Sequence, residues 1–309
     1  MKRRFRFRPV KRFVYPAPTV YINTEKELPQ KQKILVFLPH SDDGRYFGCS
    51  LYLLNKQNDI RIVIMSPGHH GVDAEVSDEE KKNIRWSEAL AWAKMLEFSE
   101  HQIFNFMADH TYNKQRIFSG DQERLNALIE KEKPTMVFIP PISDTAQAMN
   151  YYTRKMVMRS LLNWMENFHN RFLKQKRSIF IVEYPTNHVP FLSPSDKNCV
   201  IFFTNPAIAN IKHEANKMHM TQASSCYDFN ARVAEAMHAV SDADILHQMN
   251  KRRRIAECVS GVEVDPHTSR GEHFSVTKLV LNEKIKTIVE KRLLFPLSGD
   301  DLKRWNGHF

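Results

Sequence analysis

Three side chains close together near the start of the chain have types that could perform hydrolytic chemistry. An imidazole and two carboxylates, those of His40, Asp42 and Asp43, come directly after the apolar run of residues 33–38. A His and an Asp can bind a divalent metal ion, which leaves the second Asp free to take a proton from a bound water molecule. The alternative is a polar turn in which an aspartate caps a helix. The spacing alone leaves both interpretations open.

The strands and helices that would position these side chains alternate along the chain. Such alternation predicts an α/β fold, a three-layer sandwich with a mostly parallel sheet, in which sites lie beyond the carboxyl ends of strands. Apolar runs typical of strands buried on both faces occur at residues 33–38, 60–65, 135–139, 178–182 and 199–203, and a further strand is expected near 102–106. We expect helices at residues 49–56, 77–95, 122–132, 151–172, 206–221 and 228–249.

Several motifs, in the same order along the chain, resemble those of the PIG-L (LmbE-like) zinc-dependent de-N-acetylases. The segment Pro39-His40-Ser41-Asp42-Asp43 is similar to the family signature P-H-P-D-D-E. The resemblance covers roughly residues 33–280. It continues with an R-x-x-E pair at Arg85 and Glu88, a strand that ends at Ile139-Pro140-Pro141, and Glu183-Tyr184 after a further strand. A K-x-x-A-x-x-x-H-x-S/T-Q helix follows at Lys212, Ala215, His219 and Gln222. The last match, Arg270-Gly271-Glu272-His273-Phe274, is looser.

This resemblance implies a Rossmann-like fold and a metal-dependent hydrolase that removes an N-acetyl group from an amino sugar or glycoconjugate. It makes His40 and Asp43 ligands of Zn²⁺, or of another divalent metal, and Asp42 the general base for the metal-bound water. Zinc lowers the pKa of bound water toward about 7, and hydroxide then attacks the amide carbonyl.

The resemblance also implies a substrate-binding role for Arg85, Glu88 and His219. The alternatives are simpler. Arg85 and Glu88 are three residues apart, so they could form an ordinary ion pair on a helix surface. His219 could simply cover a face of the sheet.

The chain departs from the family pattern at the second metal motif, H-P-D-H. The best alignment places Ala146 and Met149 at the two histidine positions, and neither is a zinc ligand, because a thioether favours Cu(I). Gly44 also stands where the signature has its glutamate. The metal site is therefore either completed by another side chain or absent. The candidate substitutes are Asp144, His69, His70, His110 and His188.

These departures leave a second functional hypothesis, a catalytically inactive family member that binds a sugar or a protein partner. A third hypothesis, association with nucleic acid, comes from the net charge of +10. Seven Lys and Arg residues and no acid occur in residues 2–12, and a second basic run occupies residues 251–254. Both runs are typical either of a solvated surface or of a contact with phosphate, on a lipid head group or a nucleic acid.

Composition also bears on the compartment and the domain organisation. Four cysteines without a C-x-x-C pair argue against a disulfide framework and favour a reducing, cytoplasmic setting. No apolar stretch is long enough for a transmembrane helix, and the start is not typical of a secretory signal. We expect a basic arm at residues 1–32, one de-N-acetylase-like domain at 33–282 and a tail at 283–309.

Overall fold

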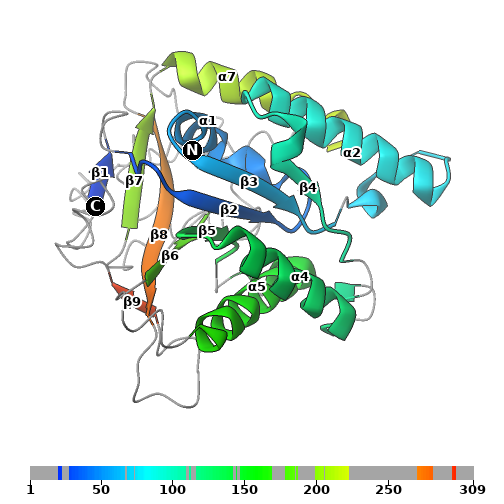
Figure 1. Ribbon diagram of the computed structural model, residues 1–309. Coiled ribbons are helices and arrows are strands. Elements are labelled where there is room, and N and C mark those ends of the chain that lie inside the picture. Colours follow the sequence, from blue (N-terminus) through cyan, green and yellow to red (C-terminus); the bar gives the residue numbers. More distant parts are fainter. Residues whose placement is uncertain are drawn as a thin grey trace, which may run out of the picture.

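The protein is built around one mixed sheet flanked by helices (Figure 1). The computed structural model describes residues 20–22, 28–66, 68–72, 74–108, 111–112, 116–141, 144, 147–168, 178–184, 186, 199–204, 206–222, 270–280 and 294–296. Within these residues, the strands follow one another in the order β1-β7-β8-β6-β5-β2-β3-β4, and β9 pairs with β8.

Five neighbouring strands form the parallel part of the sheet. They are β4 (Ile103–Asn105), β3 (Asp59–Ile64), β2 (Lys33–Leu38), β5 (Met136–Ile139) and β6 (Ser178–Glu183). The apolar runs of β3, β2, β5 and β6 are buried on both faces because helices cover both sides of the sheet, whereas Phe104 of the edge strand β4 is exposed. The predicted α/β fold with a mostly parallel sheet is confirmed.

One long strand, which the apolar pattern does not predict, reverses the direction of pairing. Strand β8 (Arg270–Val280) lies antiparallel between β6 and β7 (Cys199–Thr204), and it also pairs with β9 (Leu294–Pro296). Strand β1 (Val20–Ile22) adds to the sheet in parallel with β7. The sheet thus includes residues on both sides of the segment 33–282.

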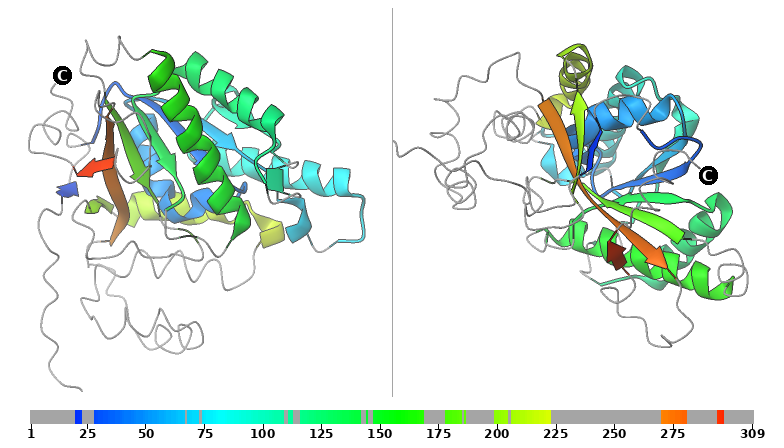
Figure 2. Two further views of the ribbon diagram at one scale, coloured as in Figure 1. Left: turned by 90° about the horizontal axis from the view of Figure 1, so that it is seen from below. Right: turned by 90° about the vertical axis from the view of Figure 1, so that its left-hand side faces the viewer.

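Helices form a layer on each face of the sheet (Figures 1 and 2). One layer contains α1 (Gly48–Asn55), α2 (Asp78–Met95) and α7 (Pro206–Asn216), and the other contains α4 (Ser119–Glu132) and α5 (Ala148–Asn167). Helix α2 begins at the predicted position, where Ser77 accepts from the backbone N–H of Glu80 and the Glu80 side chain accepts from the backbone N–H of Ser77. This capping box satisfies two polar groups that the helix end would otherwise leave without partners.

Alternate residues of the central strands pack into two separate cores. Val36 and Leu38 of β2 belong to the core under α1 and α2, whereas Leu35 and Phe37 belong to the core under α4 and α5. Because successive side chains of a strand point to opposite faces, the strand itself fixes which core each residue enters. This two-sided packing holds the carboxyl end of β2 in place, directly before His40.

Some sequence-based expectations fall on residues that the structure does not describe. The helix expected at 228–249 and the basic runs at 2–12 and 251–254 lie outside the described residues.

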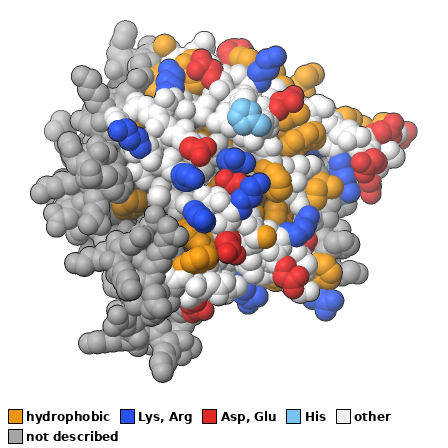
Figure 3. Space-filling model, viewed as in Figure 1, with side chains coloured by type: hydrophobic (Ala, Val, Ile, Leu, Met, Phe, Trp, Pro, Cys, Tyr) orange, Lys and Arg blue, Asp and Glu red, His pale blue; other side chains and the backbone are white. Residues whose placement is uncertain are grey.

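On the face shown in Figure 3, acidic and basic side chains are interspersed, and several Lys and Arg side chains gather near its middle. Among the described helices, none combines the length and apolar character needed to cross a bilayer.

Candidate functional site

The candidate site lies where the parallel strands end. The segments that follow β2, β3, β5 and β6 share one edge of the sheet, because these four strands are parallel neighbours. Ligands in open α/β sheets bind outside this carboxyl edge. Side chains that are far apart in the sequence meet here.

His40 and Asp43 form a hydrogen-bonded pair at the end of β2. The backbone N–H of His40 donates to Asp43 Oδ2 at 2.8 Å, and His40 Nδ1 lies 3.3 Å from the same oxygen. Burial by itself would lower the pKa of His40, but the hydrogen bond and the charge of Asp43 outweigh it and raise the pKa above its usual value. On the other side of the ring, His40 Nε2 lies 3.5 Å from Gln147 Nε2, at the start of α5.

Asp42 is held between two guanidinium groups. Arg45 Nη2 donates to Asp42 Oδ2 at 2.7 Å, and Arg85 Nη2 donates to Asp42 Oδ1. Burial alone would raise the pKa of Asp42, but the charges of Arg85 and Arg45 lower it well below its usual range. A general base works best with a pKa near the working pH. In this arrangement Asp42 is therefore a weak base, and its role as the base stays a prediction.

Arg85 and Glu88 belong to a buried polar network and not to a helix surface. Arg85 is 1% exposed, and its Nη1 lies 3.3 Å from Glu88 Oε2. Both residues contact Thr221: Arg85 Nη1 is 3.4 Å from Thr221 Oγ1, and Glu88 accepts from the backbone N–H and the hydroxyl of Thr221 at 2.7 Å each. The alternative of a surface ion pair is wrong. Whether these residues bind substrate stays a prediction.

His219 is enclosed beside this network. Its side chain is 0% exposed, its ring centroid lies 5.8 Å from that of Trp92, and neither ring nitrogen has a hydrogen-bond partner among the described residues. Burial lowers the pKa of His219 to about 3, against the opposing charge of Asp42. The imidazole is therefore neutral near pH 7. An unsatisfied buried polar group costs about 1–3 kcal/mol. Whether His219 binds substrate stays a prediction.

The loop after β3 forms a wall of the site. Gly68 has a φ of 72°, and a Cβ there would lie 3.0 Å from His40 Cδ2. The left-handed backbone and the close approach to His40 both favour glycine. Three residues later, the backbone oxygen of Gly71 accepts from Gln222 Nε2 at 2.6 Å, which ties this loop to the segment that carries His219 and Thr221.

The described side chains do not complete a zinc site. Zinc sites in proteins use three or four protein ligands, and the residues that the structure describes contain no group of three His, Cys, Asp or Glu able to hold a metal ion. Of the candidate substitutes, Asp144 is bonded to Asn150 and Thr186 instead. Met149 packs against the core under α4 and α5. The positions of His110, His188 and Ala146 are outside the described residues, as is the side chain of His70.

Restoring the second metal motif is expected to strengthen zinc binding. The double substitution Ala146→His with Met149→His supplies the two missing ligands, and we expect zinc affinity to rise about tenfold or more, which corresponds to about 1.4 kcal/mol. Titration with a zinc-sensitive dye measures this. Equal affinities in wild type and variant would mean that another residue already completes the site.

Sequence reasoning missed several residues of the site. Arg45 is three residues after Asp42, a spacing that brings side chains together on a short helix. Thr221 occupies the S/T position of the K-x-x-A-x-x-x-H-x-S/T-Q helix, so this motif was the signal for it. Gln147, Asn150 and Thr186 carried no comparable signal, because only the fold places them beside His40 and Asp144.

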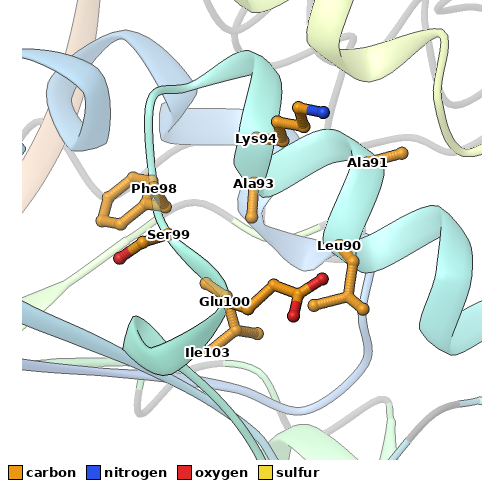
Figure 4. Close-up of a pocket in the computed structure, with 8 residues that line it drawn as sticks. All are labelled: Leu90, Ala91, Ala93, Lys94, Phe98, Ser99, Glu100 and Ile103. Atoms are coloured by element: carbon orange, nitrogen blue, oxygen red, sulfur yellow. The ribbon is translucent and has the colours of Figure 1, made fainter.

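A separate pocket lies between α2 and the turn that precedes β4 (Figure 4). Its volume is about 400 Å³, and its lining includes Leu90, Phe98, Glu100 and Ile103. None of the residues of the carboxyl-edge site lines it. The two features are independent, and the chemistry-bearing side chains belong to the carboxyl edge.

Comparisons with known proteins identify relatives of this fold. Residues 35–156, from β2 into α5, match the family model described as PIG-L, GlcNAc-PI de-N-acetylase. No curated protein matches the chain.

Solved structures also resemble the protein. The N,N'-diacetylchitobiose deacetylase of Pyrococcus horikoshii is 20% identical, with a TM-score of 0.50, over 79% of this chain and 82% of that one. A deacetylase of the teicoplanin biosynthesis pathway is 13% identical, with a TM-score of 0.53, over 81% and 99%. The 4-carboxy-2-hydroxymuconate hydratase GalB of Pseudomonas putida KT2440 is 15% identical, with a TM-score of 0.51, over 83% and 99%. At these identities the likeness is one of fold, and the fold carries more than one chemistry.

Proposed function

We propose that this chain is a hydrolase that removes an N-acetyl group from an amino sugar or glycoconjugate, because its residues 35–156 match the PIG-L family model. The family description names a GlcNAc-containing substrate. Two of the structural neighbours are deacetylases, one of them acting on a chitobiose derivative. An N-acetylated amino sugar is thus the substrate class that the family and the fold favour.

The observation that carries this proposal is the assembly of the predicted residues at one sheet edge. His40 pairs with Asp43, and Asp42 pairs with Arg85. Arg85 in turn contacts Glu88, and His219 lies close enough for the charge of Asp42 to act on its pKa. Residues from the segment after β2, from α2 and from the segment after α7 meet at the edge where open α/β sheets bind ligands.

The side chains have distinct parts in the proposed reaction. Arg45 and Arg85 keep Asp42 ionised and fix its orientation. To take a proton from the attacking water, Asp42 would first exchange one guanidinium partner for that water. The buried imidazole of His219, neutral near pH 7 and without a hydrogen-bond partner among the described residues, would have to become accessible before it could contact a polar group of the sugar. Donors that face the developing oxyanion would stabilise the transition state.

A second candidate function is supported by the same geometry. The two arginines lower the pKa of Asp42, and among the described residues His40 and Asp43 are not joined by a third potential metal donor. Both observations favour a protein that keeps the sugar site of the family and binds its ligand without hydrolysing it. The two candidates differ in a measurable property, since only hydrolysis releases acetate and a primary amine.

The distinguishing experiment measures release of a primary amine from N-acetylglucosamine conjugates, with and without added Zn²⁺. Under the first proposal, Asp42→Asn is expected to slow the wild-type reaction by about 100-fold or more, because an amide cannot accept the proton. The variant should keep the wild-type circular dichroism spectrum. Near-wild-type turnover in Asp42→Asn would show that the base is another group. Sugar binding without amine release at any metal concentration would favour the second candidate.

Two further proposals concern the setting of the protein. We infer a cytoplasmic location, supported by cysteines that form no C-x-x-C pair. We also infer that residues 2–12 contact an anionic surface, supported by their seven basic side chains. Salt-dependent binding to vesicles that contain anionic lipid tests the second inference.

A further inference from the structure

Asp144 is a buried carboxylate whose hydrogen bonds are concentrated on one oxygen. It follows β5 and is 1% exposed. Asn150 Nδ2 donates to its Oδ2 at 2.5 Å, and the Thr186 hydroxyl donates to the same oxygen. Its Oδ1 is buried and accepts no hydrogen bond from the described residues. One half of the carboxylate therefore has no protein donor in the described part of the chain.

The partners of Asp144 also differ in charge from those of the other carboxylates at the carboxyl edge. Asp42 faces two arginines, Asp43 faces His40, and Glu183 faces Arg154 at 2.5 Å. By contrast, the two partners of Asp144 in the described structure are a neutral amide and a neutral hydroxyl. A buried carboxylate without a cation is costly, and an opposite charge from a ligand would compensate it.

A second buried acceptor lies beside Asp144. The side-chain oxygen of Asn150 has no donor among the described residues, although Asn150 is 1% exposed. The amide of Asn150 donates to Asp144, so the two side chains are in direct contact. Two acceptors without donors, on adjoining side chains, call for a group that donates several hydrogen bonds. A protonated amine has three N–H donors and a positive charge.

The position of Asp144 connects it to the proposed active site. It lies three residues before Gln147, whose amide is 3.5 Å from His40 Nε2. The pKa of Tyr184 is raised first by burial and then by the charges of both Asp43 and Asp144. Its hydroxyl donates to the backbone oxygen of Phe37 in β2 at 2.6 Å. Asp144 and the pair of His40 and Asp43 thus follow neighbouring strands on one sheet edge.

We propose that Asp144 and Asn150 form a binding site for a protonated primary amine, the ammonium group of a deacetylated amino sugar. The inference rests on the proposed function, because that function supplies the amino sugar as ligand. The ammonium group would donate to Asp144 Oδ1 and Asn150 Oδ1, and its charge would balance that of Asp144. Such charge-assisted hydrogen bonds are about twice as strong as neutral ones.

The test compares two sugars that differ only at one substituent. Glucosamine carries an ammonium group where glucose carries a hydroxyl, so the ratio of their affinities isolates the contribution of the amine. In calorimetric titrations we expect the wild-type chain to bind glucosamine about tenfold more tightly than glucose. Asp144→Asn should reduce this preference to about twofold, since it removes the negative charge and keeps the side-chain shape. The matched control Glu123→Gln, the same change at an exposed position of α4, should retain the wild-type preference.

Several outcomes would overturn the proposal. One is a wild-type chain that shows no preference for glucosamine, as expected if only a water molecule occupies the site. Another is a preference that survives Asp144→Asn. If that variant does not fold, Asn150→Ala serves instead. We expect it to reduce the preference for glucosamine three- to tenfold, about 0.7–1.4 kcal/mol. An unchanged preference in Asn150→Ala would count equally against the proposal. Amine release from N-acetylglucosamine conjugates is measured separately. Hydrolysis without glucosamine preference overturns the amine site alone, and the preference without hydrolysis overturns only the proposed hydrolase.

Discussion

Replacing Arg85 by methionine is expected to lower the free energy of unfolding by about 3–5 kcal/mol, because it removes the cation that pairs with buried Glu88 and one of the two cations that pair with buried Asp42. Arg85 is 1% exposed and bridges Asp42, Glu88 and Thr221. Methionine fills most of the volume of the arginine stem, so the loss measures charge and hydrogen bonds more than packing. Denaturant unfolding followed by circular dichroism gives the value.

A matched control is Lys217→Met, which removes a cation from an exposed ion pair. Lys217 and Glu214 are 65% and 44% exposed and 2.6 Å apart. Pairs of this kind contribute about 0.2–1 kcal/mol. If Arg85→Met cost no more than Lys217→Met, the buried network would contribute nothing to stability beyond a surface pair.

The Arg85 variant should also change how stability depends on pH. The charges of Arg85 and Arg45 outweigh burial and lower the pKa of Asp42 below its usual 3.8. A carboxyl group with a lowered pKa stabilises the folded state above its unfolded pKa, and this contribution is lost as the pH falls. The difference in free energy of unfolding between wild type and Arg85→Met should therefore be largest above about pH 4 and become smaller in more acidic solution.

The central strands could be predicted from the sequence because burial on both faces leaves a continuous apolar run. Residues 33–38 and 135–139 were predicted in this way, and the structure has β2 at Lys33–Leu38 and β5 at Met136–Ile139. Strand β8 lacks such a run, since Glu272, Ser275 and Lys278 interrupt it. Its place between β6 and β7 depends on pairing with distant segments, which no local pattern encodes.

The candidate site was predictable to the extent that its residues are close in sequence or share a motif. The spacing of His40 and Asp43 placed an imidazole and a carboxylate together, and they are in contact. The pairing of Asp42 with Arg85 was not predictable in the same way, because Arg85 lies 43 residues away in the sequence, on α2. Asp144 was one of five candidate substitute metal ligands, and in the structure its carboxylate accepts a hydrogen bond from Asn150.

Gly44→Glu, which would restore the glutamate of the family signature, is expected to destabilise the protein by about 4 kcal/mol or more. A Cβ at Gly44 would lie 2.4 Å from Trp92 Cη2, closer than side chains tolerate. Trp92 is fully buried and packs against His219, so it has no open space to move into. Overpacking of this kind costs about 1–3 kcal/mol, and an unpaired buried carboxylate costs several more. Soluble yield and denaturant unfolding measure the effect.

A double-mutant cycle shows whether Trp92 is the cause. Gly44→Ala adds the clash without the charge, and Trp92→Leu removes the ring atoms that a Cβ at position 44 would meet. Trp92→Leu alone should cost about 3 kcal/mol through the cavity it leaves. In its presence, Gly44→Ala should cost less than about 1 kcal/mol, against about 1–3 kcal/mol in the wild-type background. Strict additivity of the two changes would contradict the steric explanation. A lower cost of Gly44→Ala in the Trp92→Leu background would mean that Gly44 and Trp92 pack directly against each other. The indole would then fill the volume next to Asp43, and a single substitution could not restore the signature glutamate.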